Sequence, residues 1–260
     1  MNEVFRSFTT MTKAMLYLAL MYFLSLSPAF CQDMKTIQLA AFDYPPFYSE
    51  ENGEVQGIAV ELVRELFARM DIQTEIRMYP LKRALAYLED GKADGLMILI
   101  KTAEREAYIH YTDPVLTVQG LIWAAADRKD VKVNFDRLED LIPYKIGVTL
   151  GYSYGQKFDD MLKQMHVDTG NSDYNNFRKL LVHRMDIFPA NEVVARSLFK
   201  KHPELKGKFV HSDQSFIEWI LHMGISQKSS LVHRISDINT ILADLKNEGF
   251  IHKTVRKYTE

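Results

Sequence analysis

The sequence predicts an α/β protein made of two similar units, followed by C-terminal helices. Strand-like and helix-like segments alternate between residues 36 and 100, and a second cycle of the same kind follows between residues 144 and 190. About 230 residues remain once an N-terminal leader is set aside, which is enough for two lobes with separate cores. Because a β-α-β order favours parallel strands with helices on their faces, each unit is expected to be a mostly parallel, helix-flanked sheet.

Residues 1–31 have the pattern of a secretory signal peptide. Lys13 supplies a positive charge, the apolar run "AMLYLALMYFLSLSPAF" follows, and small residues lie near Ala29. The run is shorter than the roughly 20 residues that span a bilayer, although an uncleaved anchor is the alternative. We expect cleavage after Ala29 or Cys31, since Phe30 is bulkier than the residue that normally precedes a lipidated cysteine. Cys31 is the only cysteine, so the exported chain would depend on its core, which is typical of a bacterial periplasm.

The first cycle begins with the strand "TIQLAAF", which stops at "YPPF" because two prolines exclude a helix there. A helix is expected over residues 57–70, where apolar residues recur at helical spacing. The strand "QTEIRMY" follows, and Pro80 opens a second helix that ends at Gly91. The third strand, "GLMILI", is apolar enough to be covered on both faces. The second helix is expected to turn inward Leu81, Ala84, Leu85 and Leu88.

The second cycle follows the apolar run "GLIWAAA" and a charged turn. It comprises the strand "YKIGVTL", a helix from about Ser153, the strand "VDTG", the helix "NNFRKLLVHR" and the segment "MDIFPA". The chain then ends in a long amphipathic helix, Gly249 and a short final helix. The apolar stripe of the long helix is expected at Ile235, Ile238, Ile241, Leu242 and Leu245.

Several classes of function are disfavoured by what the sequence contains. The net charge of -2 comes from well-mixed signs, so nothing attracts a polyanion such as nucleic acid. The eight histidines form no HxxxH or HExxH pattern, so no metal site is expected. A phosphate loop of the G-x-x-x-x-G-K type is missing, so no nucleotide is expected. The segment "GYSYG" has the spacing of a nucleophile elbow, but the same geometry at a helix N-terminus also binds an anion.

Arg105 is the residue whose position most favours a binding role. It follows the strand "GLMILI" and lies near the start of a helix that Thr102 can cap, where a positive charge gains nothing from the helix dipole. One interpretation is a solvated surface arginine. The other is a clamp for a carboxylate at the C-terminal edge of a parallel sheet, where α/β folds place their ligands.

Four segments resemble the bacterial extracellular solute-binding proteins of family 3, in the right order along the chain. They are "GEVQGIAVELVRELFARM", "LKRALAYLEDGKADGLM", "TAEREAYIHYTDPV" and "LADLKNEGFIHKTVRKY". The resemblance implies a two-lobed periplasmic binding protein (type II) clamshell joined by two hinge strands near residues 118–124 and 209–213. Lobe 1 would comprise residues 32–119 plus 213–260, and lobe 2 residues 120–212.

The resemblance also implies a ligand site. Arg105, from the motif "T-x-x-R", would bind the ligand's carboxylate, and Tyr44 or Phe47 would stack on its side chain. Tyr152 and Ser153 would help to hold the carboxylate from lobe 2.

Two departures from the family pattern bear on the ligand. Asn191 stands where amino acid binders usually present an aspartate to an ammonium, which puts an α-amino acid in doubt. Glu192 is a candidate for the missing negative charge. The usual serine-rich segment is replaced by residues 98–101, which leaves only backbone groups around Ile100.

The leading hypothesis is a monomeric periplasmic solute-binding protein. It would capture a small carboxylate-bearing solute, an amino acid or a related compound, and deliver it to the membrane subunits of an ABC importer, without any cofactor. The first alternative is a secreted dehydratase-like enzyme that acts on a cyclic carboxylate on the same fold. The second is a free-standing ligand sensor for a separate membrane partner.

Overall fold

The structure is a computed structural model in which residues 36–260 are described. These residues belong to one compact unit. The signal peptide expected over residues 1–31 lies outside the described residues. Within residues 36–260, no helix is both long enough and apolar enough to cross a membrane.

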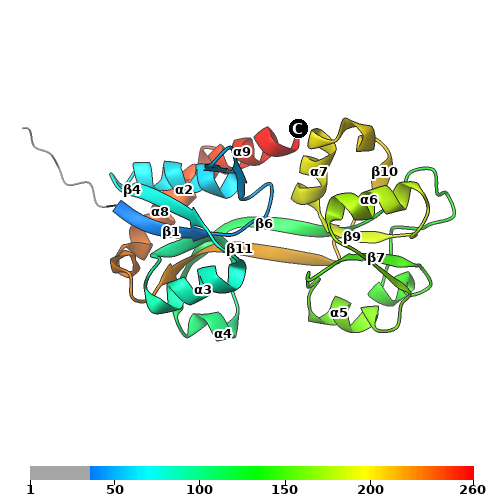
Figure 1. Ribbon diagram of the computed structural model, residues 1–260, viewed down its shortest axis with the longest axis horizontal. Coiled ribbons are helices and arrows are strands. Elements are labelled where there is room, and N and C mark those ends of the chain that lie inside the picture. Colours follow the sequence, from blue (N-terminus) through cyan, green and yellow to red (C-terminus); the bar gives the residue numbers. More distant parts are fainter. Residues whose placement is uncertain (1–35) are drawn as a thin grey trace, which may run out of the picture. The chain divides into compact units, whose positions relative to one another are not determined.

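Lobe 1 is built on three parallel strands. The strand β1 (Thr36–Ala41) lies between β4 (Gln73–Met78) and β5 (Gly95–Ile100) and pairs in parallel with both. Alternate side chains of β1 point to opposite faces of the sheet, as the period of two requires. The helix α2 (Ile58–Ala68) packs in the cluster that holds the odd-numbered side chains of β1, and α3 (Leu81–Asp90) packs with Ala40. The expected β-α-β-α-β order with helices on both faces is therefore confirmed (Figure 1).

Two long antiparallel strands, β6 (Ile109–Ala125) and β11 (Ile217–Ser226), run from lobe 1 into lobe 2 (Figure 1). Their pairing extends from Ile109 opposite Ser226 to Gly120 opposite Ile217. The second crossing strand is thus β11, and the expectation of residues 209–213 was wrong. Residues 209–211 instead form β10 (Phe209–His211), which is too short to span both lobes and pairs with the far end of β6.

Lobe 2 is a smaller α/β unit attached to the far end of β6. The strands β7 (Ile146–Thr149) and β8 (Val167–Gly170) are parallel, and β9 (Phe188–Asn191) pairs antiparallel with β6. A bridge between Ile146 and Ile187 joins the two sets of strands. The helices of this lobe are α5 (Gln156–Leu162), α6 (Asp173–Leu181) and α7 (Glu192–Lys201).

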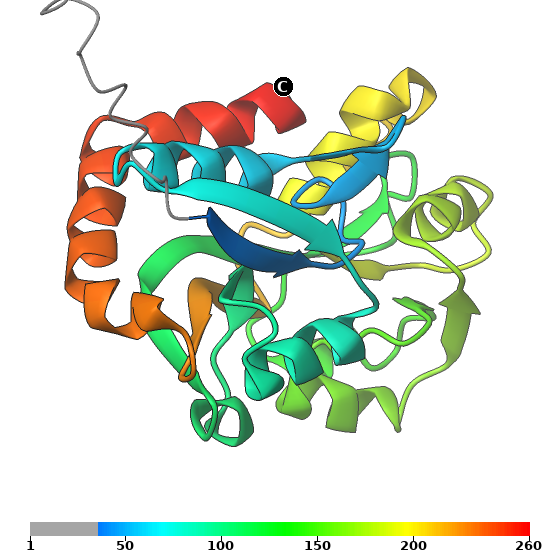
Figure 2. The same cartoon turned by 60° about the vertical axis from the view of Figure 1, so that its left-hand side comes forward.

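The C-terminal helices return to lobe 1. The apolar stripe of α8 (Ile235–Asn247) buries Ile238, Leu242 and Leu245 in the lobe 1 core, and α9 (Phe250–Thr259) lies along α2 (Figure 2). The remaining elements are the hairpin β2 (Ser49–Glu51) and β3 (Glu54–Gln56), the helix α4 (Ala103–Glu106), and the 3-10 helices η1 (Leu138–Leu141), η2 (Pro203–Leu205) and η3 (Ser230–Arg234).

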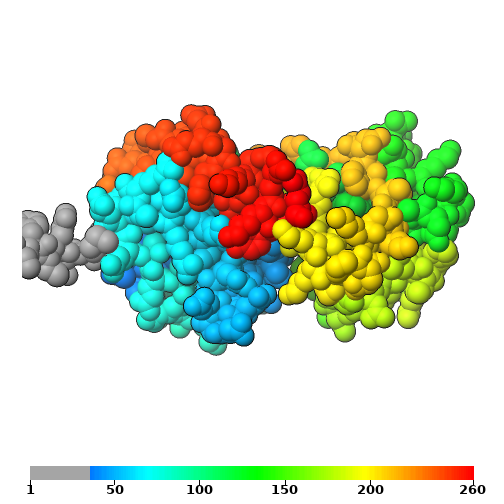
Figure 3. All heavy atoms as spheres, turned by 90° about the horizontal axis from the view of Figure 1, so that it is seen from above, coloured from blue at the N-terminus to red at the C-terminus, as the bar shows by residue number. Residues whose placement is uncertain are grey.

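The lobes also touch away from the crossing strands. The helix α7 of lobe 2 packs against α9 of lobe 1, and Figure 3 shows these segments, yellow and red, in contact. The Nζ of Lys200 donates to the carbonyl of Lys257 at 2.6 Å. The Nζ of Lys201 lies 3.6 Å from Oε1 of Glu51. These contacts hold the two lobes together on the side of the C-terminal helix.

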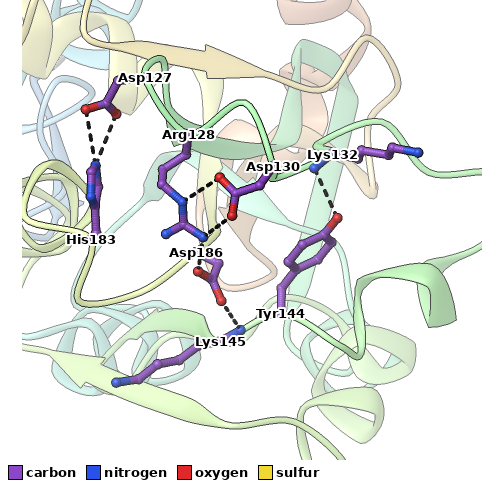
Figure 4. A network of polar contacts seen from close by, with 8 residues as sticks. All are labelled: Asp127, Arg128, Asp130, Lys132, Tyr144, Lys145, His183 and Asp186. Carbon is purple, nitrogen blue, oxygen red and sulfur yellow. Dashed lines mark hydrogen bonds and ion pairs between the residues drawn. The ribbon is translucent and has the colours of Figure 1, made fainter.

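A polar network fixes the start of β9 (Figure 4). Arg128, just after β6, binds Asp130 through two nitrogens and reaches Oδ1 of Asp186 at 2.9 Å. The other oxygen of Asp186 accepts the backbone N–H of Lys145 at 2.8 Å. The hydrogen bond from Arg128 lowers the pKa of Asp130 to about 2. These bonds join Asp186 to residues that flank β6 and β7. Five residues later, Asn191 lies opposite Gly120 in the pairing of β9 with β6.

Candidate functional site

A cavity of about 390 Å³ lies between the lobes, within the roughly 300–1,000 Å³ that small-molecule sites occupy. It is bordered by both lobes and by the crossing strands. The lobe 1 side comprises Phe42, Asp43, Tyr44, Leu81, Ile98, Leu99, Ile100 and Arg105. The crossing strands add Val118, Trp219 and Leu221, and lobe 2 adds Gly151, Tyr152, Ser153, Tyr154, Asp173, Pro189, Ala190, Asn191 and Val194.

Arg105 reaches this cavity from α4, directly after β5. The hydroxyl of Thr102 accepts the backbone N–H of Arg105 at 3.4 Å, so the helix begins where the sequence predicted. One guanidinium nitrogen donates to the carbonyl of Ile100 at 3.0 Å. No carboxylate in the described part of the chain forms an ion pair with Arg105, and the nearby Glu106 is paired with Lys101 at 2.7 Å. A guanidinium with unused donors therefore faces the cavity at the carboxyl end of a parallel strand.

The lobe 1 wall is aromatic. Tyr44 stacks on Phe42 at 5.8 Å and on Phe47 at 5.1 Å between ring centroids. Phe47 itself is fully buried beneath Tyr44 and does not line the cavity. Burial raises the pKa of Tyr44 to about 12, so its hydroxyl is neutral at physiological pH. Of the two predicted stacking residues, only Tyr44 lines the cavity.

Leu81 and Ile100 are more exposed than a core position would be. Leu81 was expected to face inward, but 37% of its surface is exposed and it lines the cavity. Leu81 is the first residue of α3, and the buried residues of this helix, Ala84 and Leu88, lie about one and two turns further along it. Ile100 is 42% exposed at the end of β5, and its carbonyl is engaged by Arg105.

The turn around Ser153 has internal hydrogen-bond partners. The hydroxyl of Ser153 donates to Oδ2 of Asp159 at 2.5 Å, and the backbone N–H of Tyr154 donates to the other oxygen at 2.9 Å. The N–H of Gly155 points to the Ser153 hydroxyl at 3.3 Å. The carboxylate of Asp159 thus occupies groups that were expected to hold the ligand's anion. Tyr152, which is 50% exposed, remains open to the cavity.

The side chain of Asn191 has two tasks in the structure. Its Oδ1 caps α7 by accepting the N–H groups of Val193 at 2.9 Å and Val194 at 3.4 Å. Its Nδ2 donates across the cavity to the hydroxyl of Tyr44 at 3.2 Å. Glu192 does not line the cavity and forms an ion pair with Arg196 at 2.8 Å on the outside of α7. Neither side chain therefore presents a free acceptor to a ligand.

Asp173 is a lining residue that the sequence reasoning missed. The residue is 7% exposed, and its carboxylate accepts the hydroxyl of Thr149 at 2.5 Å. Burial raises the pKa of Asp173 to about 6. The helix α6 was expected to begin at Asn175, which left Asp173 in a loop. The available signal was Ser172, whose hydroxyl accepts the N–H of Asn175 at 3.2 Å and starts the helix two residues earlier.

The residues described offer no group of three or more histidine, cysteine, aspartate or glutamate side chains that could hold a metal ion. The cavity instead combines an unpaired guanidinium, aromatic faces and a buried carboxyl group. This combination suits a small organic molecule with charged groups.

Residues 39–260 match the sequence model of the bacterial extracellular solute-binding proteins, family 3. The chain belongs to this family. The resemblance found in the sequence is confirmed, and so are the solute-binding role and the two-lobed clamshell fold that it implies.

Three proteins illustrate what this chain is similar to. The arginine-binding extracellular protein ArtP of Bacillus subtilis (strain 168) is 24% identical over 229 residues, which cover 86% of this chain and 86% of ArtP. The histidine-binding periplasmic protein of Escherichia coli (strain K12) is 25% identical over 261 residues, covering 95% and 97%. A solved structure of an ancestral cationic amino acid solute binding protein has a TM-score of 0.71 at 23% identity, covering 86% and 96%, and shows the shared fold alone.

Proposed function

We propose that this family 3 protein captures a small carboxylate-bearing solute, an amino acid or a related compound, between its two lobes. The observation that carries the proposal is the guanidinium of Arg105, which lines the cavity without an ion-pair partner among the described residues. Arginine binds a carboxylate through two parallel hydrogen bonds, and these are stronger than bonds between neutral groups. The end of a parallel strand is also where α/β folds place ligands.

Capture would be coupled to closure of the lobes. A ligand held by Arg105 in lobe 1 and by groups around Tyr152 in lobe 2 contacts both lobes only when they are together, so it favours the closed form. A micromolar dissociation constant corresponds to about 8 kcal/mol, which one charged bidentate pair and aromatic contacts can supply after the entropy of association is offset. We propose the lobe boundaries given above, residues 32–119 plus 213–260 and residues 120–212.

The cellular role follows from the relatives. The named relatives are extracellular or periplasmic binding proteins. We propose that this chain is exported to the periplasm through a cleaved signal peptide. There it acts as a monomer that passes its solute to the membrane subunits of an ABC importer.

The test is calorimetry of the purified protein with a panel of amino acids, dicarboxylates, amines and cyclic carboxylates. Arg105→Ala should weaken binding of the best ligand by roughly 30-fold or more, because a hydrogen bond to a charged group contributes about 2 to 3 kcal/mol. Arg196→Ala is the matched control, because Arg196 pairs with Glu192 outside the cavity. Equal affinity of the Arg105 variant and the wild type would refute the carboxylate clamp. Turnover of prephenate or arogenate would favour the dehydratase-like enzyme instead.

A further inference from the structure

The ligand-facing charge of lobe 2 comes from an unexpected residue. Asn191 has no spare acceptor, because its Oδ1 already receives two backbone N–H groups and its Nδ2 is a donor. Glu192 is neutralised by Arg196 outside the cavity. An ammonium group at this wall would therefore find no partner on either residue. Among the described residues, the buried carboxylate that lines lobe 2's side of the cavity is Asp173.

A directed chain of hydrogen bonds orients this carboxylate. The Nδ2 of Asn176 donates to the hydroxyl of Thr149 at 3.0 Å, and this hydroxyl donates in turn to Oδ1 of Asp173 at 2.5 Å. A carboxylate oxygen can only accept, so the hydroxyl of Thr149 donates to Asp173 and accepts from the buried Asn176. Within residues 36–260, no lysine, arginine or histidine pairs with Asp173, and no hydrogen bond to its Oδ2 occurs. One carboxylate oxygen is fixed by the protein, and the other is left for a donor from the cavity.

The surroundings of Asp173 favour a cation. The tyrosines Tyr44, Tyr152 and Tyr154 all lie close enough for the charge of Asp173 to raise their pKa values further, and all three remain neutral hydroxyls. Aromatic faces stabilise a ligand cation, most strongly where water is excluded. A buried carboxylate without a counter-charge is costly in an empty cavity, and an ammonium group removes that cost.

We propose that Asp173 binds an ammonium group of the captured solute from lobe 2, while Arg105 binds its carboxylate from lobe 1. This inference rests on the proposed function and narrows the ligand to molecules that carry both groups. It also assigns the ammonium subsite to the start of α6 instead of the start of α7. The ammonium can lie on the α-carbon or at the end of a side chain, and the two are separated by the choice of probes.

The probes are four six-carbon carboxylates: L-lysine, L-norleucine with only the α-ammonium, 6-aminohexanoate with only the terminal ammonium, and hexanoate with neither. Calorimetry on the wild type should show tighter binding of at least one ammonium-bearing probe than of hexanoate. Asp173→Asn should weaken that probe roughly 10- to 100-fold, as expected for a hydrogen bond to a charged group, and leave hexanoate nearly unchanged. The matched control is Asp43→Asn, because Asp43 also lines the cavity but is exposed, so a smaller loss is expected.

A second measurement separates direct pairing from a structural effect. At pH 6 the empty protein holds a proton on Asp173 about half of the time, because burial raises its pKa to about 6. Binding an ammonium group at pH 6 should release about half a proton per ligand. The release is measured by comparing the binding enthalpy in buffers of different ionisation enthalpy. Asp173→Asn should release none from this position.

Each outcome has a clear meaning. If Asp173→Asn keeps the preference for ammonium, or if hexanoate binds as well as the other probes to the wild type, the assignment of Asp173 is wrong. The proposed function would still stand if Arg105→Ala abolished that binding. If Arg105→Ala binds all probes like the wild type, the proposed function itself fails and the inference fails with it. If none of the four probes binds the wild type, the inference fails, and the wider ligand panel decides the proposed function.

Discussion

The buried carboxyl group of Asp173 has a measurable cost for the empty protein. Burial moves its pKa from the ordinary 3.8 to about 6. At about 1.4 kcal/mol for each pH unit, this difference corresponds to about 3 kcal/mol in the free energy of unfolding. Between pH 3.8 and 6 the folded state binds more protons than the unfolded state, so stability falls as the pH rises. The cost is absent below this window and complete above it.

Asp173→Asn should therefore stabilise the ligand-free protein by about 3 kcal/mol near pH 7 and have little effect near pH 3.5. The amide oxygen still accepts the hydroxyl of Thr149, so the local hydrogen bond survives the change. The nearby titratable groups Tyr44, Tyr152 and Tyr154 have raised pKa values and stay neutral throughout this range.

Urea unfolding followed by tryptophan fluorescence at several pH values between 3.5 and 7.5 measures this difference. The control is Asp130→Asn, because Arg128 lowers the pKa of Asp130 to about 2 and the sign is reversed. That variant should be slightly less stable than the wild type, by an amount that stays nearly constant above pH 4, because the stabilisation from Arg128 is lost only as the pH falls toward 2 and the ion pair is exposed. If the difference between Asp173→Asn and the wild type does not change with pH, the carboxyl group is not desolvated as described.

Three further variants test the capping of α7 and the packing of the lobe 2 core. Asn191→Ala should lower the free energy of unfolding by about 1 to 2 kcal/mol because α7 loses its cap, while Asn191→Asp should retain most of that stability; both are read from urea unfolding. Phe177→Ala should lower it by about 3 to 5 kcal/mol, because this ring is fully buried against Trp123 and Phe188, and a loss under 1 kcal/mol would contradict the packing.

Much of the architecture could be predicted because periodicity reports burial locally. The strand at residues 36–41 and the helix stripes of α2 and α8 follow from the side-chain period alone. The crossing strand β11 could not be found in this way, because one strand that serves two lobes changes its neighbours along its length. Its segment "IEWILHMGIS" alternates only in part. The sequence therefore favoured the short strand-like segment at residues 209–211 as the second crossing strand.

The site also contains features that the local sequence predicts and features that depend on residues distant in the chain. Arg105 was accessible to prediction because its motif and its place after an apolar strand agree. The hydrogen bonds of Asn191 and Ser153 could not be predicted. Those of Asn191 involve a partner distant in the chain, and the hydroxyl of Ser153 is bound by an internal carboxylate. The hydroxyl of Tyr44 lies 147 residues from Asn191, and Asp159 fills the turn at Ser153. Asp173 was missed because its burial arises from residues outside its own segment, among them the nearby Tyr44 of lobe 1 and Tyr152 and Tyr154 of lobe 2.

Under the proposed function, the hydrogen bond between Asn191 and Tyr44 affects how selectively the lobes close. It joins the two lobes through protein groups alone, and a neutral hydrogen bond of about 1 kcal/mol multiplies the ratio of closed to open receptor about fivefold. An importer that recognises the closed form would therefore also bind closed receptors that carry no solute. The uncompensated charge of Asp173 acts in the opposite direction, because closing the cavity on it removes water from a carboxylate that lacks a partner. The hydrogen bond favours closure and the charge of Asp173 opposes closure without a ligand, so the two together determine how strongly closure depends on a bound solute.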